Sequence, residues 1–411
     1  MDVKGAYLNA DMKSPKDRKT YIKLNKDITK IYLEVHPDAR KLVNGDGTLF
    51  VRADKAMYGC IQSGFLWQEA LEKVLIKLGF KICSYDRCVA RSKDGDVIVC
   101  YHVDDLLITA RTPKLRDKFI ADIQNEFKCT VKTGNSLDYL GMHIDVVPGE
   151  YIDISQLSMV EKLVKDVKGQ AATPAASVFT EPTVEEQIRN MQALNAEESA
   201  LYRSIVASCL YLSKRSRPDW LYAVNSLCRH AQSPTLGNKI AMGRLLKYAS
   251  KTRSKKLRLK CEELELKVYI DASFANNEDR KSTSGVVIML GGAVLWAKSA
   301  KQNIISKSST EAELIALSDM TSMALWMSLL INDLGFKIGP PIIFQDNQST
   351  MTVATRGLTT NTSTRHIDIR RLWIKEKISC GDIILKYLPT NDMVADGFTK
   401  PLSGAMFMKF V

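Results

Sequence analysis

Residues 97–108 read VIVCYHVDDLLI, and this stretch decides the fold of the first part of the chain. Two apolar, strand-like runs are separated only by Asp104 and Asp105, which predicts a β-hairpin with two carboxylates at its exposed tip. Because Asp-Asp is also an ordinary turn dipeptide, a purely structural turn is the alternative interpretation. A third acid, Asp2 in DVKGAYLNA, is expected at the end of another strand.

Three carboxylates brought together at such a tip would need a cation. They repel one another by about 4 kcal/mol per pair at about 4 Å and an effective dielectric constant of about 20. A divalent ion removes that repulsion, and Mg²⁺ accepts hard oxygen ligands of this kind when it also holds substrate phosphates. The acidic tip therefore indicates chemistry on phosphates.

Four segments resemble successive motifs of the reverse transcriptase of copia-type long-terminal-repeat retrotransposons: MDVKGAYLNADM, KAMYGCIQSGFLWQEALEKVLIKLGF, YHVDDLLIT and DYLGMHID. The resemblance implies a polymerase triad that holds two Mg²⁺ and promotes attack of the primer 3′-hydroxyl on the α-phosphate of a dNTP. The implied triad consists of Asp2, Asp104 and Asp105. The implied substrate-binding residues are Tyr7 as the gate against the ribose 2′-hydroxyl, Gln62 at the template and nucleotide, and Leu140 and Gly141 in the primer grip.

This sequence departs from the family pattern in two places. His102 stands two residues before the acidic pair, where the family has Tyr. Only Met1 precedes Asp2, so we expect a palm without the basic fingers region that the family places ahead of the first Asp.

The last third of the chain has four acids that follow the order strand, helix, strand, helix. They are Asp271 in VYIDAS, Glu313 in SSTEAEL, Asp346 in IIFQD and Asp396 in NDMVADGF. Each alone has a structural explanation, because Asp suits turns and Glu suits a first helical turn. Glu311 competes for the helix position, but it lies two residues from Glu313 and cannot share its helix face.

Their order resembles the ribonuclease H fold, and residues 268–319, from VYIDAS to ALSD, are similar to the copia-type ribonuclease H domain. The resemblance implies that all four acids bind two Mg²⁺ and that the RNA strand of an RNA–DNA hybrid is cut. Residues 202–235, from YRSIV to SPT, likewise resemble the helical thumb and connection of the family.

A segment rich in Ala, Pro and Thr, GQAATPAASVFTEPT at residues 169–183, is the predicted joint of the chain. The predicted domains are a palm without fingers (1–168), a linker (169–187), a helical thumb or connection (188–263), ribonuclease H (264–402) and a tail (403–411). The predicted fold class is α/β (α+β): a truncated reverse-transcriptase palm and thumb or connection, followed by a ribonuclease H-like mixed sheet with flanking helices.

A net charge of +12 predicts a polyanionic partner, with nucleic acid ahead of an anionic membrane surface. The run KYASKTRSKKLRLK at residues 247–260 has seven basic and no acidic residues, as phosphate contacts or a solvated helix end would require. By the resemblance, this run and the cations Lys214, Arg215 and Arg217 track the phosphates of the duplex without reading its sequence.

Other function classes lack their signatures. The nine cysteines are scattered without a C-x-x-C pair, which argues against a zinc ribbon or a disulfide framework. The phosphate-binding loop G-x-x-x-x-G-K-S/T and the zinc motif H-E-x-x-H are also absent. The longest charge-free stretch, residues 282–297, is shorter than the ~20 residues of a membrane span, and no apolar segment follows Met1.

Together these features predict a fragment of a copia-type polyprotein that has RNA-directed DNA polymerase and ribonuclease H activity. The expected partners are an RNA template, a DNA primer, their hybrid, dNTPs and the rest of the polyprotein (capsid, protease and integrase), but no membrane. The expected location is cytoplasmic retrotransposon particles or the nucleus. One alternative is a polymerase-inactive relic that binds nucleic acid and retains at most ribonuclease H activity. Another is a magnesium-dependent nuclease of host origin.

Overall fold

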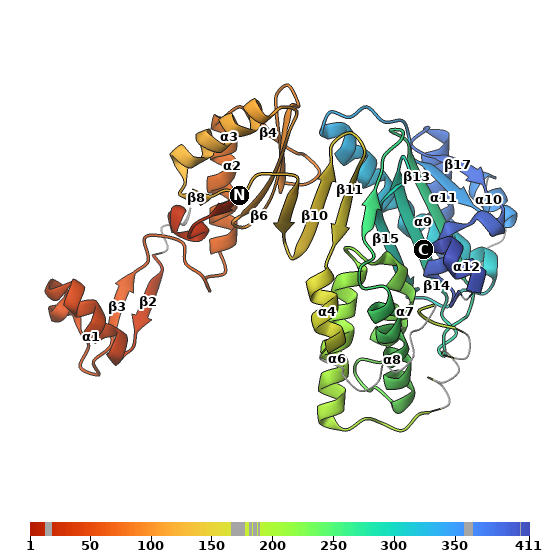
Figure 1. Ribbon diagram of the computed structural model, residues 1–411, viewed down its shortest axis with the longest axis horizontal. Helices are drawn as coiled ribbons and strands as arrows, with labels where there is room; N and C mark the ends of the chain where they lie inside the picture. The colour runs from red at the N-terminus through yellow and green to blue at the C-terminus, as the bar shows by residue number, and fades with distance from the viewer. Residues whose placement is uncertain are drawn as a thin grey trace. The chain divides into compact units, whose positions relative to one another are not determined.

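The structure is a computed structural model that describes residues 1–12, 19–165, 177–180, 183, 187, 190–356, 365–402 and 404–411 (Figure 1). The chain divides into two compact units, Met1–Thr133 and Gly134–Val411. Most of the predicted linker, residues 169–187, lies outside the described residues.

The first unit is built on a six-stranded antiparallel sheet of order β4-β5-β6-β7-β1-β8. Its elements are β1 (Asp2–Val3), η1 (Ala6–Asn9), β2 (Tyr21–Leu24), α1 (Lys26–Val35), η2 (Pro37–Leu42), β3 (Leu49–Arg52), α2 (Ser63–Lys77), β4 (Phe80–Ile82), β5 (Val89–Ser92), β6 (Val97–His102), β7 (Asp105–Ala110), α3 (Pro113–Glu126) and β8 (Cys129–Thr130). The apolar side chains of α2 and α3, such as Trp67, Leu71 and Ile123, form one core with the sheet. The hairpin predicted at residues 97–108 is confirmed as β6 and β7.

The second unit begins with a four-stranded sheet of order β12-β11-β10-β9. Its strands are β9 (Ser136–Tyr139), β10 (Met142–Val147), β11 (Tyr151–Ser155) and β12 (Leu257–Leu259). A helical bundle follows, with α4 (Leu157–Lys165), α6 (Ala196–Ser213), η3 (Pro218–Trp220), α7 (Leu221–Cys228) and α8 (Leu236–Lys251). These helices run side by side in Figure 1 and share a core around Tyr202, Trp220 and Leu245.

The predicted domain boundaries differ from this arrangement in two respects. Residues 134–165, expected in the palm, belong to the second unit, because β11 pairs with β12 and α4 packs into the bundle core. Residues 188–263, predicted as a helical thumb or connection, include the strand β12. Its Leu257 and Leu259 pair in register with Ile154 and Ile152 of β11 and do not continue the helix that ends at Lys251.

The rest of the second unit is a five-stranded mixed sheet of order β15-β14-β13-β16-β17. Its elements are β13 (Leu266–Ser273), β14 (Thr283–Leu290), β15 (Ala293–Lys301), α9 (Ser309–Asp333), β16 (Ile342–Gln345), α10 (Gln348–Thr355), α11 (Arg365–Ser379), β17 (Ile384–Tyr387), η5 (Thr390–Asp392), η6 (Val394–Phe398) and α12 (Gly404–Phe410). The first three strands are antiparallel, and β16 and β17 run parallel to β13. This is the ribonuclease H-like mixed sheet that the sequence predicts.

The tight hairpin between β14 and β15 depends on a glycine. Gly291 has φ +54°, and a Cβ added there would lie 2.2 Å from the carbonyl oxygen of Glu263. No larger residue fits this turn without moving the backbone. The turn connects β15 to β14, which pairs directly with the strand that carries Asp271.

One described helix, α9, has the length and apolar composition of a membrane span. Half of its apolar window is buried within the structure, and α9 packs against β13 and β14. Its first turns also carry the buried acids Glu311 and Glu313. Packing on the sheet therefore accounts for its apolar composition.

Candidate active sites

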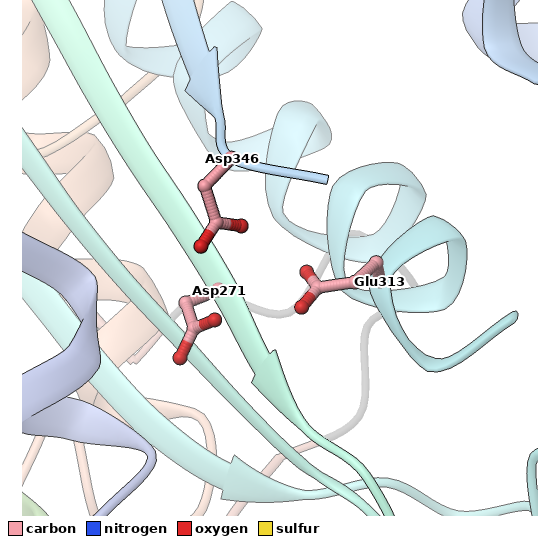
Figure 2. A group of neighbouring side chains, drawn as sticks. All are labelled: Asp271, Glu313 and Asp346. Atoms are coloured by element: carbon pink, nitrogen blue, oxygen red, sulfur yellow. The ribbon is translucent and has the colours of Figure 1, made fainter. Parts of the chain in front are cut away.

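Two strands and one helix bring three acids together in the five-stranded sheet. Asp271 lies near the carboxyl end of β13, and Asp346 directly follows β16. Because these strands are parallel, with Tyr269 opposite Phe344, both carboxyl groups emerge at the same edge of the sheet. Glu313 points toward them from the second turn of α9 (Figure 2).

The three carboxylates form a compact and largely buried cluster. One oxygen from each of Asp271, Glu313 and Asp346 lies within 4.8 Å of the others. Burial, opposed by Lys400 and reinforced by Asp396, raises the pKa of Asp271 to about 6. Burial and the nearby Asp271 and Asp346 raise the pKa of Glu313 well above its usual value.

Neighbouring polar groups fix the orientation of each acid. Gln345 Nε2 donates to Glu313 Oε2 at 3.3 Å, and Thr390 Oγ1 donates to Asp346 Oδ2 at 2.7 Å. Thr399 Oγ1 donates to Asp271 Oδ2. Oriented carboxylate oxygens that repel one another in a buried pocket suit a hard divalent cation, so this donor set fits such an ion.

The fourth predicted acid, Asp396, lies beside this cluster but outside it. It is 6% exposed and sits in the 3₁₀ turn η6 rather than in the α-helix predicted there. Lys400 Nζ lies 2.8 Å from Asp396 Oδ1 and 4.0 Å from Asp271 Oδ2. Burial lowers the pKa of Lys400, but the charges of Asp271 and Asp396 outweigh it and raise that pKa. The structure therefore places an ammonium group between the fourth acid and the other three.

The choice between the two helix acids agrees with the geometry. Glu311 accepts a hydrogen bond from the backbone N–H of Lys307 at 2.8 Å, whereas Glu313 enters the acidic cluster. Sequence reasoning missed the groups that orient the acids, namely Gln345, Thr390, Thr399 and Lys400. Only Lys400 had a sequence signal, since it follows Asp396 by four residues, a spacing that places both on one face of a helical turn.

The acids predicted for polymerisation are more open. Asp2 on β1 pairs in register with Asp105 on β7, and Asp104 lies in the turn between β6 and β7. Asp2 is exposed and accepts a hydrogen bond from Thr130 Oγ1 at 3.1 Å. Burial, together with Asp104 and Asp2, raises the pKa of Asp105. The three lie on adjoining elements as predicted. Within the described part of the chain, however, only the Asp271 group has three such ligands within 4.8 Å.

The backbone of the acidic tip is held firmly although its carboxylates are open. Trp67 Nε1 of α2 donates to the carbonyl of Val103 at 2.6 Å, and the N–H of Val3 donates to the carbonyl of Asp104 at 2.8 Å. Val103 has φ +55°, a left-handed conformation that is costly for a β-branched residue. These two contacts stabilise that conformation.

Tyr7 and Gln62 lie in the same unit as the open acids. The Tyr7 ring packs against Tyr58 with centroids 4.5 Å apart. Burial, followed by the charge of Asp104, raises the pKa of Tyr58, which places this second tyrosine near the acidic tip. Gln62 precedes α2, and its Nε2 donates to Thr20 Oγ1 at 3.3 Å. Tyr58 was not predicted from the sequence.

The predicted primer-grip residues and the exposed bundle cations lie side by side in the second unit. Leu140 and Gly141 form the β9–β10 turn with φ +47° and +72°. Tyr211 Oη donates to the carbonyl of Leu140 at 2.8 Å, and the Arg215 guanidinium lies 3.9 Å from the centre of the Tyr211 ring. Lys214 and Arg215 are both exposed. The structure thus brings the Leu140–Gly141 turn and Arg215 together around Tyr211.

Arg217, predicted to contact phosphates, is placed differently. It is 2% exposed, and its guanidinium is paired with Asp219 at 2.7 Å and donates to Thr252. A cation this deeply buried and already paired holds the bundle together and does not face a nucleic acid. We therefore remove Arg217 from the phosphate contacts.

The basic run at residues 247–260, predicted to contact phosphates, is partly occupied by ion pairs within the protein. Three of its cations alternate along β12 and its end, and each has an acidic partner. Lys256 pairs with Asp145, Arg258 with Asp153 and Lys260 with Glu262, at 2.7–2.8 Å. Much of the local charge is thereby neutralised, which weakens the case for this strand as a phosphate track.

Sequence comparisons identify the kind of protein that this chain resembles. Residues 1–181 match the family described as "Reverse transcriptase (RNA-dependent DNA polymerase)". The Pol polyprotein of transposon RE1 of Arabidopsis thaliana is 30% identical over 362 residues, covering 87% of this chain and 24% of that protein. The chain is a homologue of copia-type Pol polyproteins. The retrotransposon resemblance predicted from the sequence is therefore confirmed.

Two further relatives extend over nearly the whole chain. The Pol polyprotein of tobacco (Nicotiana tabacum) transposon TNT 1-94 is 26% identical and covers 97% of this chain and 29% of the relative. The Ty1-ER2 Gag-Pol polyprotein of Saccharomyces cerevisiae is 25% identical, with coverage of 98% and 23%. The homologue thus spans roughly a quarter of the length of the curated relatives it matches.

The fold also matches a solved structure. A foamy viral protease–reverse transcriptase in complex with an RNA/DNA hybrid superposes with a TM-score of 0.53, 11% identity, and coverage of 95% of this chain and 43% of that one. At this identity the likeness concerns the fold alone. The predicted fold class, mixed α and β with a reverse-transcriptase-like architecture, is confirmed.

Proposed function

We propose that this Pol homologue is an RNA-directed DNA polymerase with ribonuclease H activity that uses Mg²⁺ at both acidic sites. The observation that carries the proposal is the buried cluster of Asp271, Glu313 and Asp346, whose oxygens lie within 4.8 Å of one another in a ribonuclease H-like sheet. The reverse transcriptase match over residues 1–181 supports the polymerase half. The proposed substrates are an RNA template, a DNA primer, their hybrid and dNTPs.

At the proposed nuclease site the chain would hold the ions and orient them. Asp271, Glu313 and Asp346 are the proposed ligands, and Gln345 and Thr390 fix the oxygens of the last two. Magnesium bound by such carboxylates lowers the pKa of water and offsets the negative charge that develops on a phosphate under attack. Asp271 and Glu313 are almost fully buried, which strengthens the electrostatic effect of each fixed group.

At the proposed polymerase site the residues have separate tasks. Asp2, Asp104 and Asp105 are the proposed metal ligands, on strands whose pairing places Asp2 opposite Asp105. Tyr7, packed on Tyr58, is the proposed contact to the sugar of the incoming nucleotide.

A further proposed surface lies in the second unit. There the Leu140–Gly141 turn and the cation of Arg215 are the proposed contacts to primer and phosphates. Contacts of this kind hold the duplex in register without reading sequence, as copying of any template requires.

The decisive experiment is cleavage of a labelled RNA–DNA hybrid by the full chain with Mg²⁺. Asp346→Asn should abolish cleavage because it removes one ligand of the cluster. Asp319→Asn is the matched control, since Asp319 lies on the same helix α9 as Glu313 but is half-exposed and contacts Arg370 at 3.3 Å. We expect the control to cleave like the unmutated protein. Absence of cleavage by the unmutated protein would refute the nuclease proposal.

A second candidate function is a nuclease that has lost polymerisation. The observation in its favour is that Asp2, Asp104 and Asp105 do not form a cluster as tight as the Asp271 group within the described residues. Primer extension on an RNA template with dNTPs separates the two candidates. Extension supports the bifunctional enzyme, and cleavage without extension supports the nuclease alone.

A further inference from the structure

The ammonium group of Lys400 occupies the position that a second metal ion would need in order to bind Asp396, the fourth predicted acid. Its ammonium group is 2.8 Å from Asp396 Oδ1 and 4.0 Å from Asp271 Oδ2. Asp396 and Asp271 are both almost fully buried, at 6% and 3% exposure. The fourth acid therefore already has a cationic partner, and that partner is part of the chain.

The local backbone holds Lys400 in this place. The N–H groups of Thr399 and Lys400 both donate to the carbonyl of Asp396 at 3.1 Å, which closes a helical turn. The side chains of Asp396 and Lys400 therefore lie on one face of that turn. The turn packs closely on β14: a Cβ added to Gly285, the residue opposite Asp271, would lie 2.6 Å from Thr399 Cγ2. The position of the ammonium group is thus built into the fold.

The geometry assigns to Lys400 the role of a displaceable counter-charge that keeps the second divalent ion out until nucleic acid binds. This inference rests on the proposed function. Paired ions in such sites lie about 3.5–4 Å apart and share a carboxylate. An ion that bridges Asp271 and Asp396 would have to lie where the ammonium group lies, and like charges at that separation repel strongly. Without nucleic acid, the centre should hold one ion, on Asp271, Glu313 and Asp346.

Lys400 also has a way to leave. Its side chain is 38% exposed, while Asp396 beneath it is buried, so the ammonium group can reach solvent by rotating its flexible stem. A phosphate of a bound hybrid is a strong alternative partner for a lysine ammonium. Transfer of Lys400 from Asp396 to a phosphate would free Asp396 at the moment when substrate is present. The chain would then assemble its second ion site only on substrate.

The test counts ions directly and needs no turnover. Mn²⁺ binding to the full chain is followed by electron paramagnetic resonance in an Asp104→Asn/Asp105→Asn background, so that the polymerase acids do not contribute. We expect the protein with Lys400 unchanged to bind one ion and the Lys400→Met protein to bind two. The affinity for the second ion should be roughly tenfold or more higher in the Lys400→Met protein than in the protein with Lys400. Lys400→Arg keeps the charge and should bind one ion. A hybrid with a 2′-O-methylated RNA strand should raise the count from one to two for Lys400.

Additional variants distinguish the possible failures. Asp396→Asn in the Lys400→Met protein should remove the second ion and leave the first. Lys400→Gln replaces Lys400→Met if the latter does not fold. Two ions bound by the unmutated Lys400 centre without nucleic acid, or one ion bound by both neutral variants, would overturn the role of Lys400. Loss of the first ion in Asp346→Asn is expected under either result. A first ion that survives that change would instead refute the proposed metal centre.

Discussion

The two acidic centres of this homologue use the same carboxyl chemistry in different surroundings. Asp271, Glu313 and Asp346 are gathered by a parallel strand pair and a core helix, and burial raises the pKa of the first two. On the antiparallel tip Asp2 is exposed and Asp104 and Asp105 are half-buried, and burial together with Asp104 and Asp2 raises the pKa of Asp105. The comparison indicates that carboxylate repulsion is held in an almost fully buried setting in the Asp271 group and in a half-buried one at the tip that carries Asp105.

The largest expected effect separates the two centres by function. Asp104→Asn should reduce primer extension by roughly 10³-fold or more, because it removes a ligand for ions that supply several kcal/mol of charge stabilisation. Cleavage of a preformed hybrid should remain unchanged, since Asp104 lies in the other unit. Both activities are measured on one preparation of the full chain. Parallel loss of the two activities would show that the centres are not independent.

The pH dependence of stability should differ between the centres. Folding raises the pKa of Asp271 from 3.8 to about 6, so the folded state holds that proton more tightly. Its contribution to stability is complete below the unfolded pKa and is lost as the pH rises through about 6. Without metal, the free energy of unfolding of Asp271→Asn should therefore rise relative to that of the unmutated protein by roughly 2–3 kcal/mol between acid and neutral pH.

Urea denaturation at several pH values, monitored for each variant by a signal from the unit that carries the substitution, measures this difference. Asp105→Asn is the matched comparison, because the pKa of Asp105 is raised in a more open site. Its pH-dependent change should be clearly smaller. Equal changes at the two positions would contradict the contrast between a buried and an open centre.

A substitution at neutral pH sharpens the same comparison. Glu313→Gln keeps the acceptor for Gln345 Nε2 but removes a charge that is buried beside Asp271 and Asp346. We expect the metal-free protein to gain on the order of 1–2 kcal/mol in free energy of unfolding. Asp2→Asn should change it by less than about 0.5 kcal/mol, as at most exposed positions. With saturating Mg²⁺, Glu313→Gln should instead be less stable than the unmutated protein, because the ion stabilises only the charged cluster.

Much of this contrast could be predicted from the sequence. Apolar runs that flank Asp104, and acids placed at the ends of strands and in a helical turn, identified both centres and the choice of Glu313 over Glu311. These patterns are local, and local spacing determines which face a side chain takes. The order of strands and helices predicted a mixed sheet with flanking helices, and the resemblance to ribonuclease H came from the motifs that carry the four acids.

The remaining features depend on contacts between distant segments. Asp219 lies only two residues after Arg217, but nothing in the sequence shows that Thr252, 35 residues later, also binds the guanidinium and that the group is buried, so its charge was assigned to nucleic acid. The strand β12 is recognisable only through its pairing with β11, more than 100 residues earlier. Lys400 was overlooked because a single basic residue after an acid is common. The role inferred for Lys400 depends on Asp271 as well, because β13 places this second carboxylate 4.0 Å from the ammonium group.

The smallest expected effect concerns how the open centre is held. Trp67→Phe keeps most of the buried ring but removes the hydrogen bond to the carbonyl of Val103. Val103 is the residue with φ +55°. A lost hydrogen bond of this kind costs about 1 kcal/mol, and the left-handed turn should become less populated. We therefore expect a small loss of stability, measured by urea denaturation, and a larger proportional loss of primer extension.

Trp220→Phe provides the control for that change. Trp220 is fully buried, but its indole nitrogen has no hydrogen-bond partner among the described residues, so the substitution removes ring area without a hydrogen bond. It should lower stability and leave primer extension largely intact. If both tryptophan variants lose extension equally, the acidic tip does not depend on the Trp67 contact. The backbone of the open centre would then be held by strand pairing alone, as Asp2 and Asp105 are.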